Sequence, residues 1–326
     1  MSQSFTNSMR EKASKLSLKV AFADSEDIRT LKSAIILKEQ GIAKPILVGN
    51  EAKIKELAEK ENVSLKEIEI VEPEKSEHLE KFANMLYEKR KSKGMTESEA
   101  LAIVKTPLYF AGFMLETDLV KVAIAGNVSA TGDVIRASIF TVGVAAGISI
   151  VSSYFIMVLQ DGRKICFADC AVNPDPTEEQ LADIAISSAR NFASVTGEEA
   201  RVAMLSFSTK GSANHPDVDK VVAATKIVQE KAPDLLVDGE MQADAALVAS
   251  IGERKCKGSP VAGKANVLIF PDLNSANIGY KLTERLAGAE AVGPFVQGLK
   301  KPYCDLSRGC SVDDMVNVAA ICSLMA

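Results

Sequence analysis

The segment from residue 301 to residue 314 gathers a hydroxyl, a guanidinium and carboxylates just before an apolar stretch that ends the chain. Pro302 and Gly309 punctuate this segment, which predicts that Ser307 and Arg308 lie in a tight turn rather than inside a helix. The planar guanidinium of Arg308 can donate parallel hydrogen bonds to two oxygens of a phosphate or carboxylate. A helix that starts after the turn would add free N–H groups and a positive dipole end. The sequence therefore predicts an anion site here, with Asp314 one helical turn away.

Asp314 has a second interpretation, which stays open at this stage. Ser311 and Asp314 have the spacing of a capping box, in which the carboxylate only accepts a hydrogen bond from the backbone at the start of a helix. Residue types alone do not separate this structural role from a role in proton transfer.

The elements before this segment alternate between apolar strands and amphipathic helices. Strand followed by helix, repeated, predicts parallel sheets with helices on both faces. The expected strands are residues 19–24, 45–49, 68–71 and 120–125, and the expected helices are residues 28–40, 51–60 and 76–93, the last ended by Gly94.

The second half of the chain continues the alternation. We expect a helix that starts at a capping box of Thr177 and Gln180. Residues 137–159 carry no charge, and we interpret them as the end of a buried helix (residues 134–147) and a central parallel strand (154–159), rather than as a membrane span. The other expected strands are residues 165–168, 202–206, 235–237 and 267–270.

Two loops that follow expected strands are rich in small and hydroxyl residues. The loop after residue 125 leads into a helix that carries Arg136, with Thr131 as a possible cap. The loop at residues 206–212 offers the donors Ser208, Thr209 and Lys210. Glycine-rich loops of this kind can turn several backbone N–H groups toward one anion, and ligands of doubly wound sheets bind where strands end. An ordinary loop or capped helix start is the alternative in each case.

Composition excludes several classes of function. The net charge of −5 implies no general affinity for nucleic acid or anionic membranes. The first residues lack the apolar core of a signal peptide, so we expect a cytoplasmic protein with six reduced cysteines. No cysteine pair has the spacing of a zinc site, and the chain has only two histidines.

Two nucleotide-binding motifs are absent. Residues 258–265 nearly match a nucleoside-triphosphate P-loop, but Ala265 cannot ligate magnesium and the phrase precedes an expected strand. The first strand is not followed by the glycine pattern typical of dinucleotide-binding dehydrogenases.

Several phrases resemble those of phosphate acetyltransferases. They are Pro302 with residues 305–309, and residues 206–212, 238–242 and 271–281, so the resemblance spans nearly the whole chain. It implies an α/β fold of two doubly wound domains with a cleft between them, like isocitrate and isopropylmalate dehydrogenases. It also implies that residues 1–147 and 296–326 form one discontinuous domain and residues 148–295 an inserted second one, and that the protein is a homodimer.

The resemblance also implies a reaction, reversible acetyl transfer between coenzyme A and phosphate, without a metal or a further cofactor. Asp314 would be the general base, Arg308 would hold the phosphate, and Ser307 would hydrogen-bond the reacting groups. Arg90, in a Tyr-x-x-Arg pattern, and Arg136 would bind coenzyme A, although Ala137 replaces the family's usual proline after Arg136. Ser208, Thr209 and Lys210 would border the cleft.

Three other functions remain open. A phosphate butyryltransferase would use the same chemistry with a roomier acyl pocket. A metal- and NAD-dependent decarboxylating dehydrogenase of the same fold would need an acidic metal cluster, which the sequence does not display. A regulatory protein could bind phosphorylated metabolites without turning them over.

Overall fold

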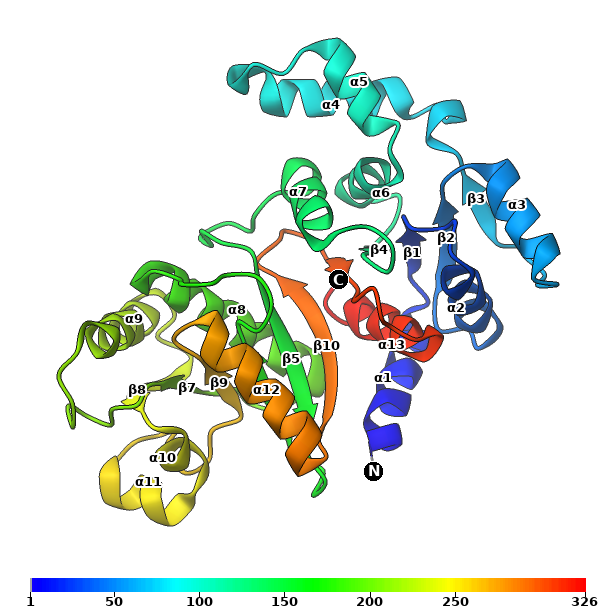
Figure 1. Ribbon diagram of the computed structural model, residues 1–326. Coiled ribbons are helices and arrows are strands. Elements are labelled where there is room, and N and C mark those ends of the chain that lie inside the picture. Colours follow the sequence, from blue (N-terminus) through cyan, green and yellow to red (C-terminus); the bar gives the residue numbers. More distant parts are fainter. Residues whose placement is uncertain (1) are drawn as a thin grey trace. The chain divides into compact units, whose positions relative to one another are not determined.

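The computed structural model describes residues 2–326, with side chains from residue 5 onward. Contacts within the chain divide it into two compact units. The first consists of Thr6–Gly143 together with Leu299–Ala326, and we call it the split unit. The second consists of Val144–Gly298 together with the residues that precede Thr6, and we call it the central unit. Figure 1 labels the elements of both.

The split unit is built on a five-stranded parallel sheet in the order β11-β4-β1-β2-β3. Its strands are apolar on both faces, as expected for a parallel sheet covered by helices. Their bounds are β1 Lys19–Phe22, β2 Lys44–Val48, β3 Glu69–Val71, β4 Val122–Ala125 and β11 Tyr303–Asp305.

Helices cover both faces of this sheet (Figure 1). Helices α2 (Ile28–Glu39) and α13 (Val312–Ser323) pack on one face, and α6 (Pro107–Glu116) and α7 (Thr131–Thr141) pack on the other. Helices α4 (Leu79–Arg90) and α5 (Glu97–Val104) pack against each other, and Thr96 and Glu99 form a capping box at the start of α5. Helices α1 (Ser2–Leu16) and α3 (Glu51–Lys60) and two short 3₁₀ helices, Pro73–Lys75 and Lys91–Lys93, complete the set.

The central unit contains a six-stranded mixed sheet in the order β10-β5-β6-β9-β7-β8. Strands β6, β9, β7 and β8 run parallel, whereas β5 is antiparallel to both of its neighbours. The bounds are β5 Ser152–Val158, β6 Lys164–Ala168, β7 Arg201–Leu205, β8 Leu236–Met241, β9 Val267–Ile269 and β10 Glu290–Gln297.

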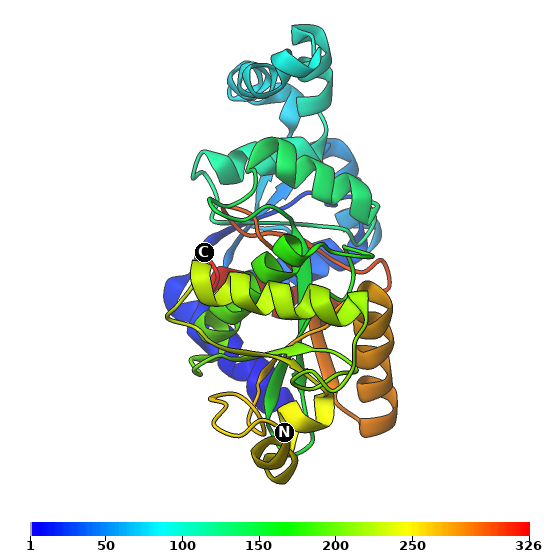
Figure 2. The same ribbon diagram turned by 90° about the vertical axis from the view of Figure 1, so that its left-hand side faces the viewer.

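The helices of the central unit also lie on both faces of its sheet. Helices α8 (Glu178–Thr196) and α9 (Pro216–Lys231) pack on one face; α9 is the yellow-green helix nearest the viewer in Figure 2. Helices α12 (Leu273–Ala287) and α10 (Ala243–Leu247) pack on the other, with α11 (Ala249–Lys255) beside α10. The expected capping box of Thr177 and Gln180 starts α8.

Two predictions for residues 134–159 are wrong in detail. The helix ends at Thr141 rather than at residue 147, because Gly143 adopts a left-handed conformation with φ +81° and residue 145 bonds to Gly298 instead. The following strand is antiparallel, not parallel. Its residues are all buried, so the burial that an uncharged run predicts does not reveal the direction of the strand.

No helix within residues 2–326 is long and apolar enough to cross a membrane. The prediction that residues 137–159 do not form a span is consistent with their division into α7, a connecting segment and β5.

Candidate active site

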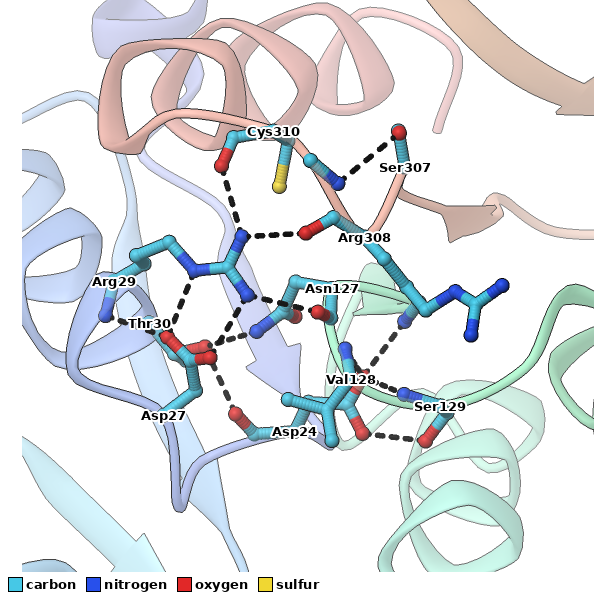
Figure 3. Close-up of polar contacts among 12 residues, drawn as sticks. Asp24, Asp27, Arg29, Thr30, Asn127, Val128, Ser129, Ser307, Arg308 and Cys310 are labelled. Atoms are coloured by element: carbon cyan, nitrogen blue, oxygen red, sulfur yellow. Dashed lines mark hydrogen bonds and ion pairs between the residues drawn. The ribbon is translucent and has the colours of Figure 1, made fainter.

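Three loops meet at the carboxyl ends of the parallel strands in the split unit. One follows β1 and contains Asp24, Asp27 and the first residues of α2. The second follows β4 at Gly126, and the third follows β11 and carries the turn at Ser307. Neighbouring parallel strands end at the same edge, so residues that are far apart in the sequence come into contact there, as Figure 3 shows.

The predicted turn exists between β11 and α13. The Oγ of Ser307 accepts a hydrogen bond from the Gly309 N–H at 3.3 Å, and the Cys310 N–H donates to the Ser307 carbonyl at 3.0 Å. Ser307 and Arg308 are both exposed. The guanidinium of Arg308 forms no hydrogen bond or ion pair with any residue that the structure describes, and Figure 3 shows it pointing away from Arg29. The Arg308 fork is therefore free to receive an anion.

Asp314 forms the capping box that its spacing predicts. Its Oδ2 accepts hydrogen bonds from the Ser311 N–H at 2.9 Å and the Ser311 hydroxyl at 2.8 Å, and the Asp314 N–H donates to the Ser311 Oγ at 3.1 Å. Both bonds to the carboxylate use Oδ2, which leaves Oδ1 without a partner among the described residues. Asp314 is exposed, and capping occupies only one of its two carboxylate oxygens, so capping and proton transfer are compatible.

Arg29 lies at the centre of the three loops, although the sequence did not single it out. Its side chain donates to Asp27 from Nε at 3.0 Å and from one terminal nitrogen at 2.8 Å. It also donates to the backbone carbonyls of Asn127 at 2.8 Å, Arg308 at 2.8 Å and Cys310 at 3.0 Å. Hydrogen bonds with Asp27 raise the pKa of Arg29. Burial raises the pKa of Asp27, but bonds from the Arg29 side chain and backbone outweigh it, so that pKa is lowered.

The loop after β4 turns its N–H groups toward a carboxylate of the same chain, that of Asp24. The Oδ2 of Asp24 accepts hydrogen bonds from the N–H groups of Gly126 at 2.8 Å, Val128 at 3.1 Å and Ser129 at 3.1 Å. Its Oδ1 accepts from the Ser129 hydroxyl at 2.5 Å. These donors are therefore already used. Thr131 is not the cap of α7, because it is the first helical residue and Ala130 precedes it.

Asp305, at the end of β11, is a buried acid in an unusual environment. Its Oδ1 is buried without a hydrogen-bond partner in residues 2–326. Burial, joined by the charge of Asp24 and opposed by a hydrogen bond with Thr131, raises the pKa of Asp305 to about 6. A Cβ on Gly126 would lie 2.1 Å from that oxygen, so only glycine fits where the two loops cross.

We expect Asp305→Asn to be more stable than the wild type at neutral pH. Because the pKa of Asp305 is raised from 3.8 to about 6, the folded state binds the proton more tightly than the unfolded state. Stability therefore falls as the pH rises through this interval, and at neutral pH the cost is on the order of 2–3 kcal/mol. Asparagine does not ionise, so its advantage in melting temperature should grow between about pH 4 and pH 7. A difference that is constant across this range would contradict the raised pKa.

Arg90 and Arg136 approach the same side of the split unit. The Arg90 guanidinium lies 3.9 Å from the ring centroid of Phe140, and its Nε is buried with no acceptor among the described residues. Phe140 is one turn after Arg136 on α7, and its ring meets Tyr109 edge-on. Among the described residues, Arg136 pairs only with Asp133, at 3.4 Å, and both side chains are more than half exposed. Both guanidinium groups can therefore accept a further anionic partner.

Ser208, Thr209 and Lys210 lie in the central unit, and each side chain is already engaged there. Ser208 donates to Glu240 at 2.8 Å and Thr209 to Gln242 at 3.3 Å, while Lys210 forms an ion pair with Asp238.

The backbone of this loop, which was predicted to turn its N–H groups toward an anion, also has an acceptor within the chain. The Gly211 N–H donates at 2.8 Å to the same oxygen of Glu240 that Ser208 contacts. Glu240 is 3% exposed, so its carboxylate is a buried internal anchor for the loop. The loop is thus preformed, and Lys210, which donates to Asp238 and to the Gly239 carbonyl, keeps one ammonium N–H free.

The expectation of six reduced thiols stays a prediction. The structure brings the sulfur atoms of Cys304 on β11 and Cys322 on α13 together, whereas Cys166, Cys170, Cys256 and Cys310 are free and buried. A pairing across 18 residues gives no spacing signal in a sequence, so only the fold could reveal it.

The described residues contain no group of three or more histidine, cysteine, aspartate or glutamate side chains arranged to hold a metal ion. The prediction that the protein needs no metal stays a prediction.

Comparison with known proteins assigns this combination of fold and site to a family. The model of the family described as "Phosphate acetyl/butaryl transferase" matches residues 4–323. The chain belongs to this family of phosphate acyltransferases. A phosphate acetyltransferase of Thermoanaerobacterium thermosaccharolyticum is 46% identical over 328 residues, which cover 99% of both proteins.

Solved structures agree with this assignment. A phosphotransacetylase from Streptococcus pyogenes has a TM-score of 0.94 at 37% identity, covering 99% of this chain and 98% of that one. A putative 4-hydroxythreonine-4-phosphate dehydrogenase from Salmonella typhimurium shares the fold alone, with a TM-score of 0.59 at 11% identity. The predicted resemblance and the dehydrogenase-like α/β fold are confirmed.

Proposed function

We propose that the protein is a phosphate acetyltransferase that converts acetyl-CoA and phosphate into acetyl phosphate and coenzyme A, reversibly. The observation that carries this function is the full-length match to the family, together with relatives of that name at 46% and 44% identity. The free guanidinium of Arg308, beside a helix start and an aspartate, is the feature of the chain best suited to the chemistry.

The mechanism follows from the groups that remain free at the turn. Toward acetyl-CoA, the free Oδ1 of Asp314 takes the proton from the thiol of coenzyme A. The thiolate attacks the carbonyl carbon of acetyl phosphate, the bond from carbon to the phosphate oxygen breaks, and phosphate leaves. Arg308 holds the phosphate through two parallel hydrogen bonds and offsets the charge of the tetrahedral intermediate.

Ser307 has a supporting role in this mechanism. Its hydroxyl oxygen accepts from Gly309, which leaves its proton free to donate to the thioester carbonyl or the phosphate. No side chain that could act as a base is bonded to this hydroxyl among the described residues, which favours hydrogen bonding over a covalent acyl-serine.

Because the reaction needs stabilisation of charge rather than a Lewis acid, we propose that it requires neither a metal nor a cofactor, with coenzyme A as a substrate.

Arg90 and Arg136 are our candidates for binding the phosphates of coenzyme A. Replacing either by alanine should raise KM for coenzyme A with little change in kcat, because a contact that is equal in ground and transition states affects binding alone. Steady-state kinetics with varied coenzyme A measure this. The control is Arg163→Ala in the central unit, because Arg163 forms an ion pair with Asp161. An unchanged KM in both variants would mean that the two arginines are solvated surface residues that do not bind coenzyme A.

The loop of Ser208, Thr209 and Lys210 is a further candidate for binding a phosphate group in this proposal. Glu240, Gln242 and Asp238 hold its side chains in place, and one ammonium N–H of Lys210 remains free to donate.

We also propose a homodimer located in the cytoplasm, where coenzyme A thioesters are made and used. Helix α12 exposes Ile278, Leu282 and Leu286 along one stripe, with exposed fractions of 56%, 51% and 82%. Lys281 and Glu284 flank the stripe, so two antiparallel copies of α12 would match in charge. Sedimentation equilibrium of the intact protein gives the oligomeric state.

The function is tested by following the ultraviolet absorbance of the thioester bond of acetyl-CoA. The protein should consume this thioester only when phosphate is present. The same assay with butyryl-CoA distinguishes the acetyltransferase from the butyryltransferase of this family. A higher kcat/KM for butyryl-CoA than for acetyl-CoA would identify the protein as a phosphate butyryltransferase. Binding of acetyl-CoA without loss of the thioester would indicate a regulatory protein.

A further inference from the structure

Arg29 and Arg308 differ sharply in how their donors are used. A guanidinium has five N–H donors. The five hydrogen bonds that Arg29 donates, two to Asp27 and three to backbone carbonyls, use all of them. Arg308, at the same edge of the sheet, uses none within the described residues. Arg29 therefore has no donor left for a substrate, whereas Arg308 has its whole fork available.

The acceptors of Arg29 belong to all three loops of the site. The carbonyls of Arg308 and Cys310 lie on either side of Gly309, so one nitrogen of Arg29 holds both ends of the turn. Its other terminal nitrogen bridges Asp27, at the start of α2, and Asn127, after β4. Asp27 also caps α2 by accepting from the Arg29 N–H at 2.8 Å, so side chain and backbone fix the arginine together.

We propose that Arg29 is the positioning residue of the active site: it holds the backbone of the Ser307–Arg308 turn against the loops after β1 and β4, so that the Arg308 fork faces the phosphate. The proposal rests on the function proposed above. An exposed turn punctuated by glycine has little internal structure, and apart from Arg29 only two hydrogen bonds within the turn, at 3.3 Å and 3.0 Å, hold it. Misplacement of a reacting group by about 1 Å can cost about 10²-fold in rate.

Lysine cannot replace Arg29 in this role. An ammonium group has three donors at a single point, whereas the acceptors of Arg29 lie on three sides of a plane. Arg29→Lys keeps the charge and the ion pair with Asp27 but cannot reach all three carbonyls. We expect kcat to fall about 10- to 10²-fold, with KM for coenzyme A within about twofold of the wild type, because Arg90 and Arg136 are untouched.

The control variant is Arg10→Lys. Arg10 also ties an element to α13, by donating to Asn317 at 2.8 Å and to Asp313 at 2.5 Å, but it does not contact the turn. It should lower the melting temperature without lowering kcat. A purely structural Arg29 would behave in the same way.

Chemical rescue separates positioning from general stability. In Arg29→Ala, low millimolar guanidinium should restore kcat at least fivefold, because the free ion offers the same planar donors; methylammonium at the same concentration should not. The proposal is overturned if Arg29→Lys keeps kcat within twofold, or if kcat falls in Arg29→Ala and guanidinium does not restore it. Absence of acetyl transfer by the wild type would instead overturn the proposed function.

Discussion

Asp314→Asn is expected to lose about 10²- to 10⁴-fold in kcat while its melting temperature stays nearly that of the wild type. The two roles of Asp314 use different oxygens, and asparagine affects them differently. The amide oxygen can still accept from Ser311, so the capping box is largely kept and a loss of no more than about 1 kcal/mol is expected. The amide cannot take a proton from a thiol, so the role of general base is lost.

Melting temperature and kcat measured on the same purified protein decide between the roles. Asp313→Asn is the matched control, because Asp313 is the neighbouring exposed acid and pairs with Arg10 rather than with Ser311. It should keep its activity. If the Asp314→Asn variant melts early but turns over normally, Asp314 is a helix cap alone, and Ser307 and Arg308 remain as the reacting groups.

Arg308→Lys is expected to lower kcat by about 10²-fold or more. Lysine keeps the positive charge but not the two parallel donors that match two phosphate oxygens. The guanidinium of Arg308 is exposed and has no partner within the described residues, so the substitution breaks no bond of the protein and should leave the melting temperature unchanged. A change in rate then reports on the substrate rather than on the fold.

The appropriate comparison is Arg163→Lys, since Arg163 is an exposed arginine of the central unit that pairs with its neighbour Asp161 at 2.7 Å. This variant should keep full activity. Near wild-type turnover by Arg308→Lys would mean that charge alone is needed, and the bidentate role would have to be abandoned.

Much of the fold could be predicted because its signals are local. The cap and periodicity of α8 and the apolar runs of β1, β2 and β4 lie within short windows of sequence. Strands β10 and β11 were missed, since β10 contains Gly293 and Pro294 and β11 lies within the segment that was interpreted as a turn. The antiparallel direction of β5 was missed because pairing is not encoded in burial.

The site was predictable only where it is one continuous segment. Ser307, Arg308 and the capping box of Asp314 lie within eight residues, so their spacing carries information. Arg29 is separated from its carbonyl acceptors by 98 to 281 residues, and its acceptors are backbone atoms, which have no residue type. The only local signal was Asp27 as a helix cap two residues earlier.

The two glycine-containing loops show a second limit of sequence analysis. Both were predicted to gather N–H groups around an anion, and both do, but the anions are Asp24 and Glu240. Whether such a loop binds a ligand or a carboxylate of its own chain depends on which acid the fold brings to it.

The central claim, acetyl transfer to phosphate at the Ser307–Arg308 turn, is tested most directly by the release of free thiol from acetyl-CoA. The assay contains the purified protein, acetyl-CoA and a chelator, with no NAD, and phosphate is the variable. We predict that thiol appears only when phosphate is added, in equal amount to the acetyl phosphate formed. Release that is independent of phosphate, or that requires NAD or a metal, would contradict this account.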